Sequence, residues 1–170
     1  MKNLKFFGVL LVMLAVTVTV NAQSLTKVYD AYGVSMKYAS NMEVVDDEYE
    51  DGQFMMALSN EDEDMVMFVM VMQDDEMSEM FKLLNLEGLF DLMKENIVAE
   101  AGDNFTFGGA VQKQDSNNCS QTFTASEDGE KIYGEVMMSV RGDKFIISMI
   151  ASQEKSDLNT LKASYNSLKV

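Results

Sequence analysis

The most apolar stretch of the chain is a run of eight residues, 65–72, with the sequence MVMFVMVM. Acidic residues at 61–64 and 74–76 bound it on both sides. The run is too short to cross a bilayer, and its valines and phenylalanine favour a strand over a buried helix. Successive side chains of a strand point to opposite faces, so both faces of this strand are apolar. The pattern predicts a central strand that other layers cover on both sides.

Shorter segments of alternating apolar and polar residues predict further strands. Asp51-Gly52 separates two of them and is a strong hairpin signal, because both central residues of a type I′ turn adopt positive φ. Short acidic turns join the early strands into a meander, and the second half of the chain repeats the pattern. The expected strands are 25–29, 33–38, 42–49 and 53–59 before the apolar run, and 105–112, 119–126, 131–140 and 144–152 after it.

A long helix is expected directly after the apolar run. Residues 77–97 carry Met, Phe, Leu and Ile at steps of three and four, which is the spacing of an amphipathic helix. Asp75 or Ser78 can cap its start, and Gly102 is a natural stop at its end. Gly88 can break it into two pieces.

A second helix is expected to close the chain. Leu158, Leu161, Tyr165 and Leu168 form its apolar stripe, with Ser152 or Ser156 as its cap. Strands, one long helix, strands and one closing helix together predict an α+β fold. Its sheet is expected to be a largely antiparallel meander with helices packed on both faces, as in an α/β/α sandwich.

The N-terminus has the parts of a secretory signal peptide. Lys2 and Lys5 precede a short apolar core, and the small residues Val20 and Ala22 stand at the third-last and last positions before the expected cleavage site. We place the signal peptide at residues 1–22 and a single domain at 23–170. A retained membrane anchor is the weaker alternative, because the apolar core is short. The protein is expected to be exported to the periplasm of a Gram-negative bacterium or secreted, with no integral membrane segment after signal removal.

The chain is strongly acidic, with a net charge of −15 that becomes −17 when Lys2 and Lys5 leave with the signal peptide. Such a charge repels nucleic acid and anionic lipid, so neither is expected as a partner. Cys119 is the only cysteine, which excludes an intrachain disulfide, and its alternating context predicts a small buried hydrophobe. The chain has no histidine to activate a thiol. We expect no enzyme activity and no cofactor.

Calcium is the strongest cation hypothesis. Asn60, Asp62 and Asp64 place oxygen side chains at alternate positions, as a hard cation requires. The match to an EF-hand loop ends there, because Met65 and Val71 stand where its glycine and bidentate glutamate belong. The methionines at 65, 67, 70 and 72 have paired spacing that suits copper(I), but apolar neighbours favour a core role for them. Hydrolysis by a pair of carboxyl groups in a pocket is a further hypothesis.

Two segments resemble the PsbP-like and DcrB-like group of small exported α+β domains. Residues 29–42, YDAYGVSMKYASNM, resemble the opening of that family, in which "G-[FV]-S" leads to Tyr-Pro-x-x-Trp. Ala39 and Met42 replace the proline and the tryptophan. Residues 161–165, LKASY, resemble the "Ser-Phe" ending of the family. The group is named for an extrinsic photosystem II subunit and a bacterial periplasmic protein, and includes a eukaryotic factor that binds the small GTPase Ran.

The resemblance implies a scaffold for contacts with diverse proteins and no shared active site. The leading functional hypothesis is therefore an exported, non-enzymatic accessory module whose partner is a protein. The alternative is a protein that binds a small ligand or a metal such as calcium in a cleft between sheet and helix.

Overall fold

The structure is a computed structural model of the chain and describes residues 24–73, 75–127 and 129–170. The predicted signal peptide lies outside these residues. The strands are β1 (Leu25–Ala31), β2 (Val34–Ala39), β3 (Met42–Glu50), β4 (Gln53–Asn60), β5 (Met65–Met72), β6 (Phe105–Lys113), β7 (Asn118–Glu127), β8 (Glu130–Arg141) and β9 (Lys144–Ser152). The helices are α2 (Asp75–Ala101), the short 3₁₀ turn η1 (Gly102–Asn104) and α3 (Leu158–Ser167). Each predicted element is present, with ends within a few residues of the expected ones.

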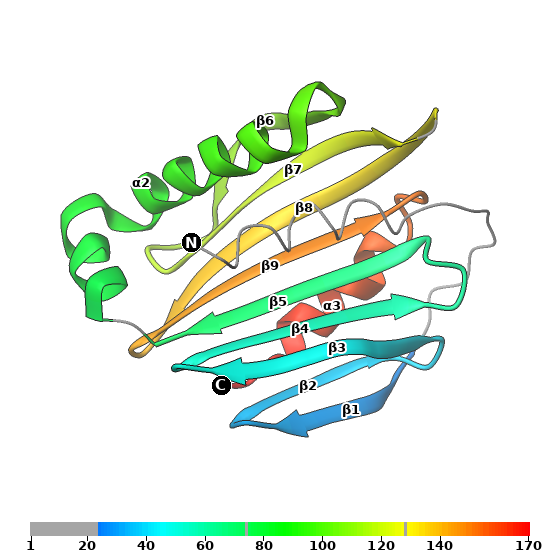
Figure 1. The fold of residues 1–170 in the computed structure, drawn as a ribbon, viewed down its shortest axis with the longest axis horizontal. Coiled ribbons are helices and arrows are strands. Elements are labelled where there is room, and N and C mark those ends of the chain that lie inside the picture. Colours follow the sequence, from blue (N-terminus) through cyan, green and yellow to red (C-terminus); the bar gives the residue numbers. More distant parts are fainter. Residues whose placement is uncertain (1–23, 74, 128) are drawn as a thin grey trace.

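Seven of these strands form one antiparallel sheet in the order β3-β4-β5-β9-β8-β7-β6 (Figure 1). The two predicted meanders are therefore its two halves, and β5 pairs with β9 where the halves meet. β1 and β2 pair with each other as a separate two-stranded sheet. The expected largely antiparallel α+β fold is confirmed, with the first hairpin set apart from the main sheet.

β5 separates two hydrophobic cores, because all eight of its residues are buried. Its even-numbered residues belong to one core, together with Leu86, Leu89 and Phe90 of α2. Its odd-numbered residues belong to the other, together with Leu161 and Tyr165 of α3. The two apolar faces predicted from the sequence thus meet two different layers.

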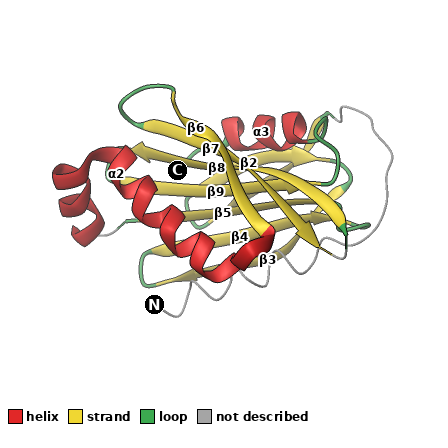
Figure 2. Ribbon diagram, turned by 90° about the horizontal axis from the view of Figure 1, so that it is seen from above, coloured by secondary structure: helices red, strands yellow, loops and turns green. Residues whose placement is uncertain are grey.

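The two helices lie on opposite faces of the main sheet (Figure 2). α2 contacts β6, β7 and β8, whereas α3 contacts β8 and β9 and also packs on the β1–β2 hairpin. Backbone hydrogen bonds join the hairpin to the segment after α3, since Ser35 and Lys169 each donate an N–H to the carbonyl of the other. Residues 29–42 and 161–165, which carry the family resemblance, share this second core.

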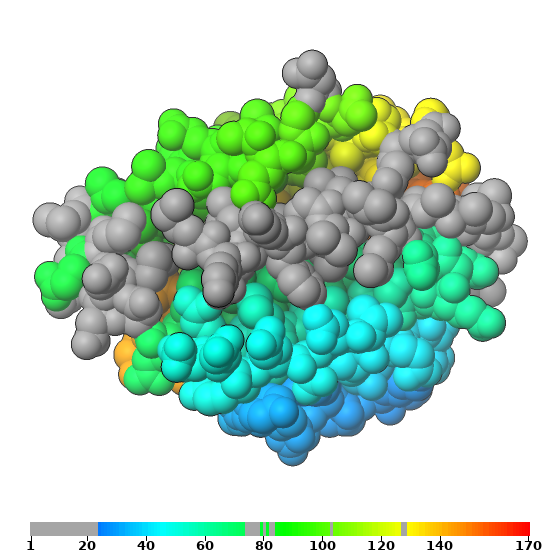
Figure 3. Space-filling view, in the orientation of Figure 1, coloured from blue at the N-terminus to red at the C-terminus, as the bar shows by residue number. Residues whose placement is uncertain are grey.

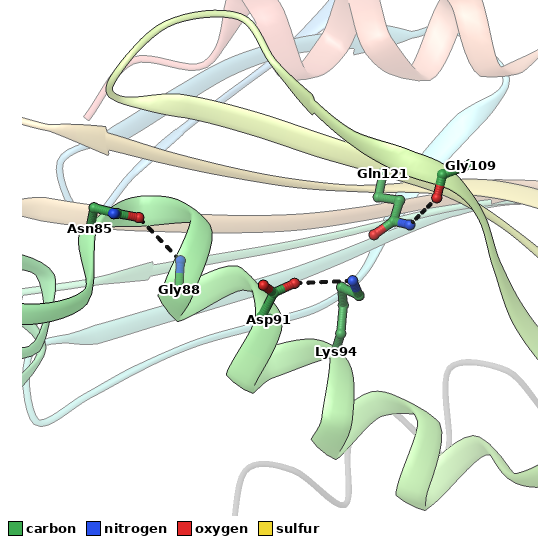
Figure 4. Close-up of polar contacts among 6 residues, drawn as sticks. All are labelled: Asn85, Gly88, Asp91, Lys94, Gly109 and Gln121. Atoms are coloured by element: carbon green, nitrogen blue, oxygen red, sulfur yellow. Dashed lines mark hydrogen bonds and ion pairs between the residues drawn. The ribbon is translucent and has the colours of Figure 1, made fainter.

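The break in α2 falls at Asn85, not at Gly88 as predicted. Asn85 has φ 57° and ψ 178°, a conformation that interrupts the helix. Its Oδ1 atom accepts hydrogen bonds from the backbone N–H groups of Glu87 and Gly88, so Asn85 caps the second part of the helix. Figure 4 shows the bond to Gly88. Asparagine is a good cap and tolerates positive φ better than most residues. Gly102, with φ 69°, follows the end of α2 as expected.

The predicted caps of the helices have different outcomes. The side chains of Asp75 and Ser78 lie outside the described part of the structure. At the start of α3 the capping position is Asp157, not Ser152 or Ser156, and its side chain makes no capping hydrogen bond. The Oγ atom of Ser152 instead accepts a hydrogen bond from the N–H of Glu154, within the turn before the helix.

Candidate functional site

Two exposed tyrosines stack at the edge of the molecule. Tyr32, in the β1–β2 turn, and Tyr49, on β3, have ring centroids 5.7 Å apart and planes 6° apart. Their exposed fractions are 56% and 53%. Val28 on β1 and Val45 on β3 are equally exposed. Four of the seven large hydrophobic side chains that are exposed in the described residues therefore lie on β1, β3 and the turn beside them.

Contacts between β1 and β3 position this tyrosine pair. Lys27 pairs with Glu43, and the Tyr29 hydroxyl donates a hydrogen bond of 2.8 Å to Asp47. Burial raises the pKa of Tyr29, and the hydrogen bond and negative charge of Asp47 raise it further, so its hydroxyl stays protonated as the donor. The hairpin is thereby held beside β3 at the level where Tyr32 meets Tyr49.

The strand that carries Tyr49 is acidic and forms an edge of the main sheet. Figure 3 shows β3 and β4 in cyan beside the blue residues of β1 and β2, at the lower border of this view. Residues 42–51 contain six acids and no Lys or Arg. We call Tyr32, Tyr49 and these acids the tyrosine surface; the acids are Glu43, Asp46, Asp47, Glu48, Glu50 and Asp51.

A polar pocket lies between α3 and the strands β7 and β8. Its volume is about 330 Å³. α3 contributes Lys162, Tyr165 and Asn166, and β8 contributes Glu135 and Met137. Met138 of β8 also lines it, and Gln114, Asn118, Cys119 and Ser120 form the wall on the side of β7. Both a charged pair and neutral hydrogen-bonding groups therefore converge on one cavity.

Glu135 and Lys162 form an ion pair in the lining of this pocket. The Glu135 side chain is 10% exposed, whereas that of Lys162 is 41% exposed. The Oε2 atom of Glu135 is buried and accepts no hydrogen bond beyond its contact with the Lys162 ammonium group. Tyr165 is fixed by a hydrogen bond of 3.0 Å from its hydroxyl to Ser139.

The structure brings together two of the three predicted calcium ligands. The Asn60 amide donates to the Asp64 carboxylate, and Asn60 Oδ1 accepts from the Met65 backbone N–H. Asp62 is exposed in the same turn. Asp157, the residue before α3, lies near Asp64: burial raises the pKa of Asp157, and the negative charge of Asp64 raises it further.

No cluster of three or more Asp, Glu, Cys or His residues suited to a metal occurs within residues 24–73, 75–127 and 129–170. The calcium site stays a prediction. Cys119 is buried, as expected, and burial raises the pKa of its thiol to about 12. A thiol with this pKa is protonated at neutral pH and is a poor nucleophile.

Comparison with solved structures identifies the fold. No protein-family model and no curated protein matches the sequence. The solution structure of cyanobacterial PsbP (CyanoP) from Synechocystis sp. PCC 6803 is similar with a TM-score of 0.55 and 14% identity, over 92% of this chain and 97% of that one. A crystal structure from Bacteroides thetaiotaomicron VPI-5482 is similar with a TM-score of 0.55 and 13% identity, over 86% of this chain. The match covers 49% of that longer chain, so this chain spans about half of its length.

The class that these findings define is the PsbP-like α+β fold. The resemblance inferred from residues 29–42 and 161–165 is thus confirmed at the level of the fold. No helix in the described part of the chain is long and apolar enough to cross a membrane.

The tyrosine surface and the polar pocket were missed from the sequence. Tyr32 and Tyr49 are 17 positions apart, and Glu135 and Lys162 are 27 apart, so no local spacing connects either pair. One local signal was present. Tyrosine at position 32, before Gly33 in a two-residue turn, is unusual because that position favours Asn, Asp or Gly.

Proposed function

We propose that the chain is an exported, non-enzymatic accessory module that binds a protein partner through the tyrosine surface. The observation that carries the proposal is the stacked pair Tyr32 and Tyr49. Each of the two side chains is more than half exposed, and the pair lies beside the contact between β1 and β3. Tyrosine is enriched at protein interfaces because it offers a large rigid apolar area together with a polar tip. The PsbP-like fold supports this role by similarity of architecture.

The charge around the tyrosines indicates the kind of partner. Six acids and no basic residue in 42–51 favour a partner that presents Lys or Arg. The acids also have a structural role, because charges along an edge strand oppose pairing with the edge of another molecule. Preventing edge pairing does not require exposed aromatic rings. The two exposed tyrosines therefore need another explanation, which a binding role provides.

Capture by matched variants tests the proposal. The exported, processed chain would be crosslinked under mild conditions in the exported fraction of its own cells, beside a Tyr32→Asn/Tyr49→Ser variant. Val98→Ser is the control, since Val98 is an exposed apolar residue on α2, away from β1 and β3. We expect one specific protein to be captured by the wild type and the control and lost with the double variant.

Salt dependence is the second readout. Because exposed charges are screened at high ionic strength, the captured amount is expected to fall between about 0.05 M and 0.5 M salt. Equal capture by the wild type and the double variant would show that the tyrosines do not form the interface. Capture that rises with salt would contradict the proposed basic partner.

The proposal includes no catalytic step. The acid pair that a hydrolytic mechanism needs is represented by Asp64 and Asp157, but neither carboxyl group lines the pocket beneath α3. The thiol of Cys119 is buried and protonated at neutral pH. A turnover assay of the processed chain with aryl glycoside, ester and peptide substrates is expected to give the same rate as buffer.

A further inference from the structure

The pocket between α3 and β7–β8 contains a charged pair that the proposed protein-binding role does not use. Its volume of about 330 Å³ lies in the lower part of the range for small-ligand sites. The pocket is bounded by α3 and by the polar wall of β7, and none of its lining residues belongs to the tyrosine surface. The two sites can therefore be tested separately.

Glu135 is the unusual group in this pocket. Glutamate is rarely buried to this extent unless it is paired, and a buried carboxylate is stable only when its oxygens are well satisfied. Here Oε2 has the Lys162 ammonium group beside it but accepts no hydrogen bond of good geometry. The ordinary interpretation is a pair that holds α3 onto β8. It accounts for the attraction but leaves the buried oxygen incompletely satisfied.

The two members of the pair differ in freedom to move. Glu135 is fixed on β8, in the middle of the sheet, with a side chain that is 10% exposed. Lys162 is 41% exposed, and its long side chain can turn toward solvent without leaving α3. A ligand can therefore enter between the two groups while the backbone of the pocket stays as it is.

We propose that this pocket binds a small zwitterion, a free α-amino acid, with its ammonium group on Glu135 and its carboxylate on Lys162. The ammonium and carboxylate groups of the ligand share one carbon atom, and they match the two opposite charges that lie side by side in the lining of the pocket. The amide and hydroxyl groups of Asn118, Ser120 and Asn166 supply neutral partners for the remaining hydrogen bonds of the ligand. A ligand with a single charge would leave either Glu135 or Lys162 without a counter-charge.

Titration of the processed chain with L-alanine, followed by amide resonances, tests the proposal. We expect shifts confined to the pocket, at Ser120, Met137 and Asn166, saturating below about 20 mM ligand. N-acetylalanine lacks the ammonium group and alaninamide lacks the carboxylate, and each is expected to bind about tenfold more weakly or worse. Equal binding of alaninamide would overturn the assignment of a zwitterion, and no shift with L-alanine would overturn the site.

Variants connect the binding to the two charges. Glu135→Gln is expected to weaken alanine binding by about tenfold or more, and Lys162→Met by a similar factor. Lys37→Met is the matched control, because Lys37 is an exposed lysine on β2 outside the pocket. Dispersed amide resonances verify that each variant is folded, and unchanged binding by a folded Glu135→Gln or Lys162→Met protein would overturn the proposal. Loss of alanine binding with protein capture intact would separate this site from the tyrosine surface.

Discussion

At the scale of single residues, Tyr32 occupies a position that its side chain does not favour. Its φ of 54° lies in the left-handed region, where a bulky residue costs about 1–2 kcal/mol. Its stacking on Tyr49 returns about 0.5–1.5 kcal/mol. The two effects nearly cancel, so Tyr32→Asn should change the free energy of unfolding by less than about 1 kcal/mol. Stability alone therefore does not explain why residue 32 is a tyrosine.

Asp157 is a second residue that acts against stability, and its effect depends on pH. Because its pKa is raised in the folded chain, the unfolded state binds fewer protons above the ordinary value of 3.8. The stability of the wild type therefore falls as the pH rises from 3.8 through the raised pKa. We expect Asp157→Asn to increase the free energy of unfolding at neutral pH, measured with urea, and this gain to shrink as the pH falls through the raised pKa toward 3.8.

Asp115 provides the control of opposite sign. A hydrogen bond from the backbone of Asn117 and one from the side chain of Asn118 lower its pKa. Asp115→Asn should therefore lower stability at neutral pH, with the effect disappearing in acid. If both variants changed stability in the same direction, the local electrostatics of Asp64 and Asp157 would not be the cause.

The same measurements with added calcium test the predicted cation site, since bound cation should raise the stability of the wild type.

At the scale of elements, the sequence was sufficient to predict the strands but not the position of the break in α2. The strands were predicted because alternation over six or more residues has a strict period of two, and the turns carry Asp-Gly or Gly-Asp. The break of α2 was placed at Gly88 on residue type alone. The break lies at Asn85, because the Asn85 side chain accepts hydrogen bonds from the backbone of the following turn, and glycine has no side chain to do so.

This capping role predicts the behaviour of α2 when Asn85 is replaced. Asn85→Ala removes both side-chain hydrogen bonds and puts an alanine at a φ of 57°, so we expect a loss of about 1–2 kcal/mol in the free energy of unfolding. Asn85→Asp should keep most of the stability, because its carboxylate accepts the same bonds. Urea unfolding followed by circular dichroism is the measurement. A neutral Asn85→Ala together with a destabilising Gly88→Ala would return the break to Gly88.

At the scale of the whole molecule, contacts between distant segments could not be predicted from spacing. The tyrosine surface joins β1 to β3, and the polar pocket joins β8 to α3. The tyrosine surface depends on where the β1–β2 hairpin lies, and the polar pocket depends on how α3 packs across the sheet. One-dimensional periodicity determines neither placement. The fold class was accessible because order of elements and two-faced burial of residues 65–72 are local properties.

The two-sided burial of β5 also determines how the molecule should unfold. Leu89→Ala removes contacts only from the core under α2, and Leu161→Ala only from the core under α3; each should cost about 2–5 kcal/mol. Hydrogen exchange measured by amide resonances is expected to show the same loss of protection on both sides of the sheet in either variant. Protection that falls only around α3 in Leu161→Ala would show instead that the cores open independently.

Cooperativity of this kind would protect the chain from a half-open state. If one layer could detach alone, the methionine-rich face of β5 beneath it would meet solvent, and exposed apolar surface of this kind promotes aggregation. If disturbance of one core also disturbs the strand that both share, partial opening is no easier than complete unfolding. A strand with no polar side chain is then tolerable, because cooperative unfolding would leave no intermediate stage that exposes it.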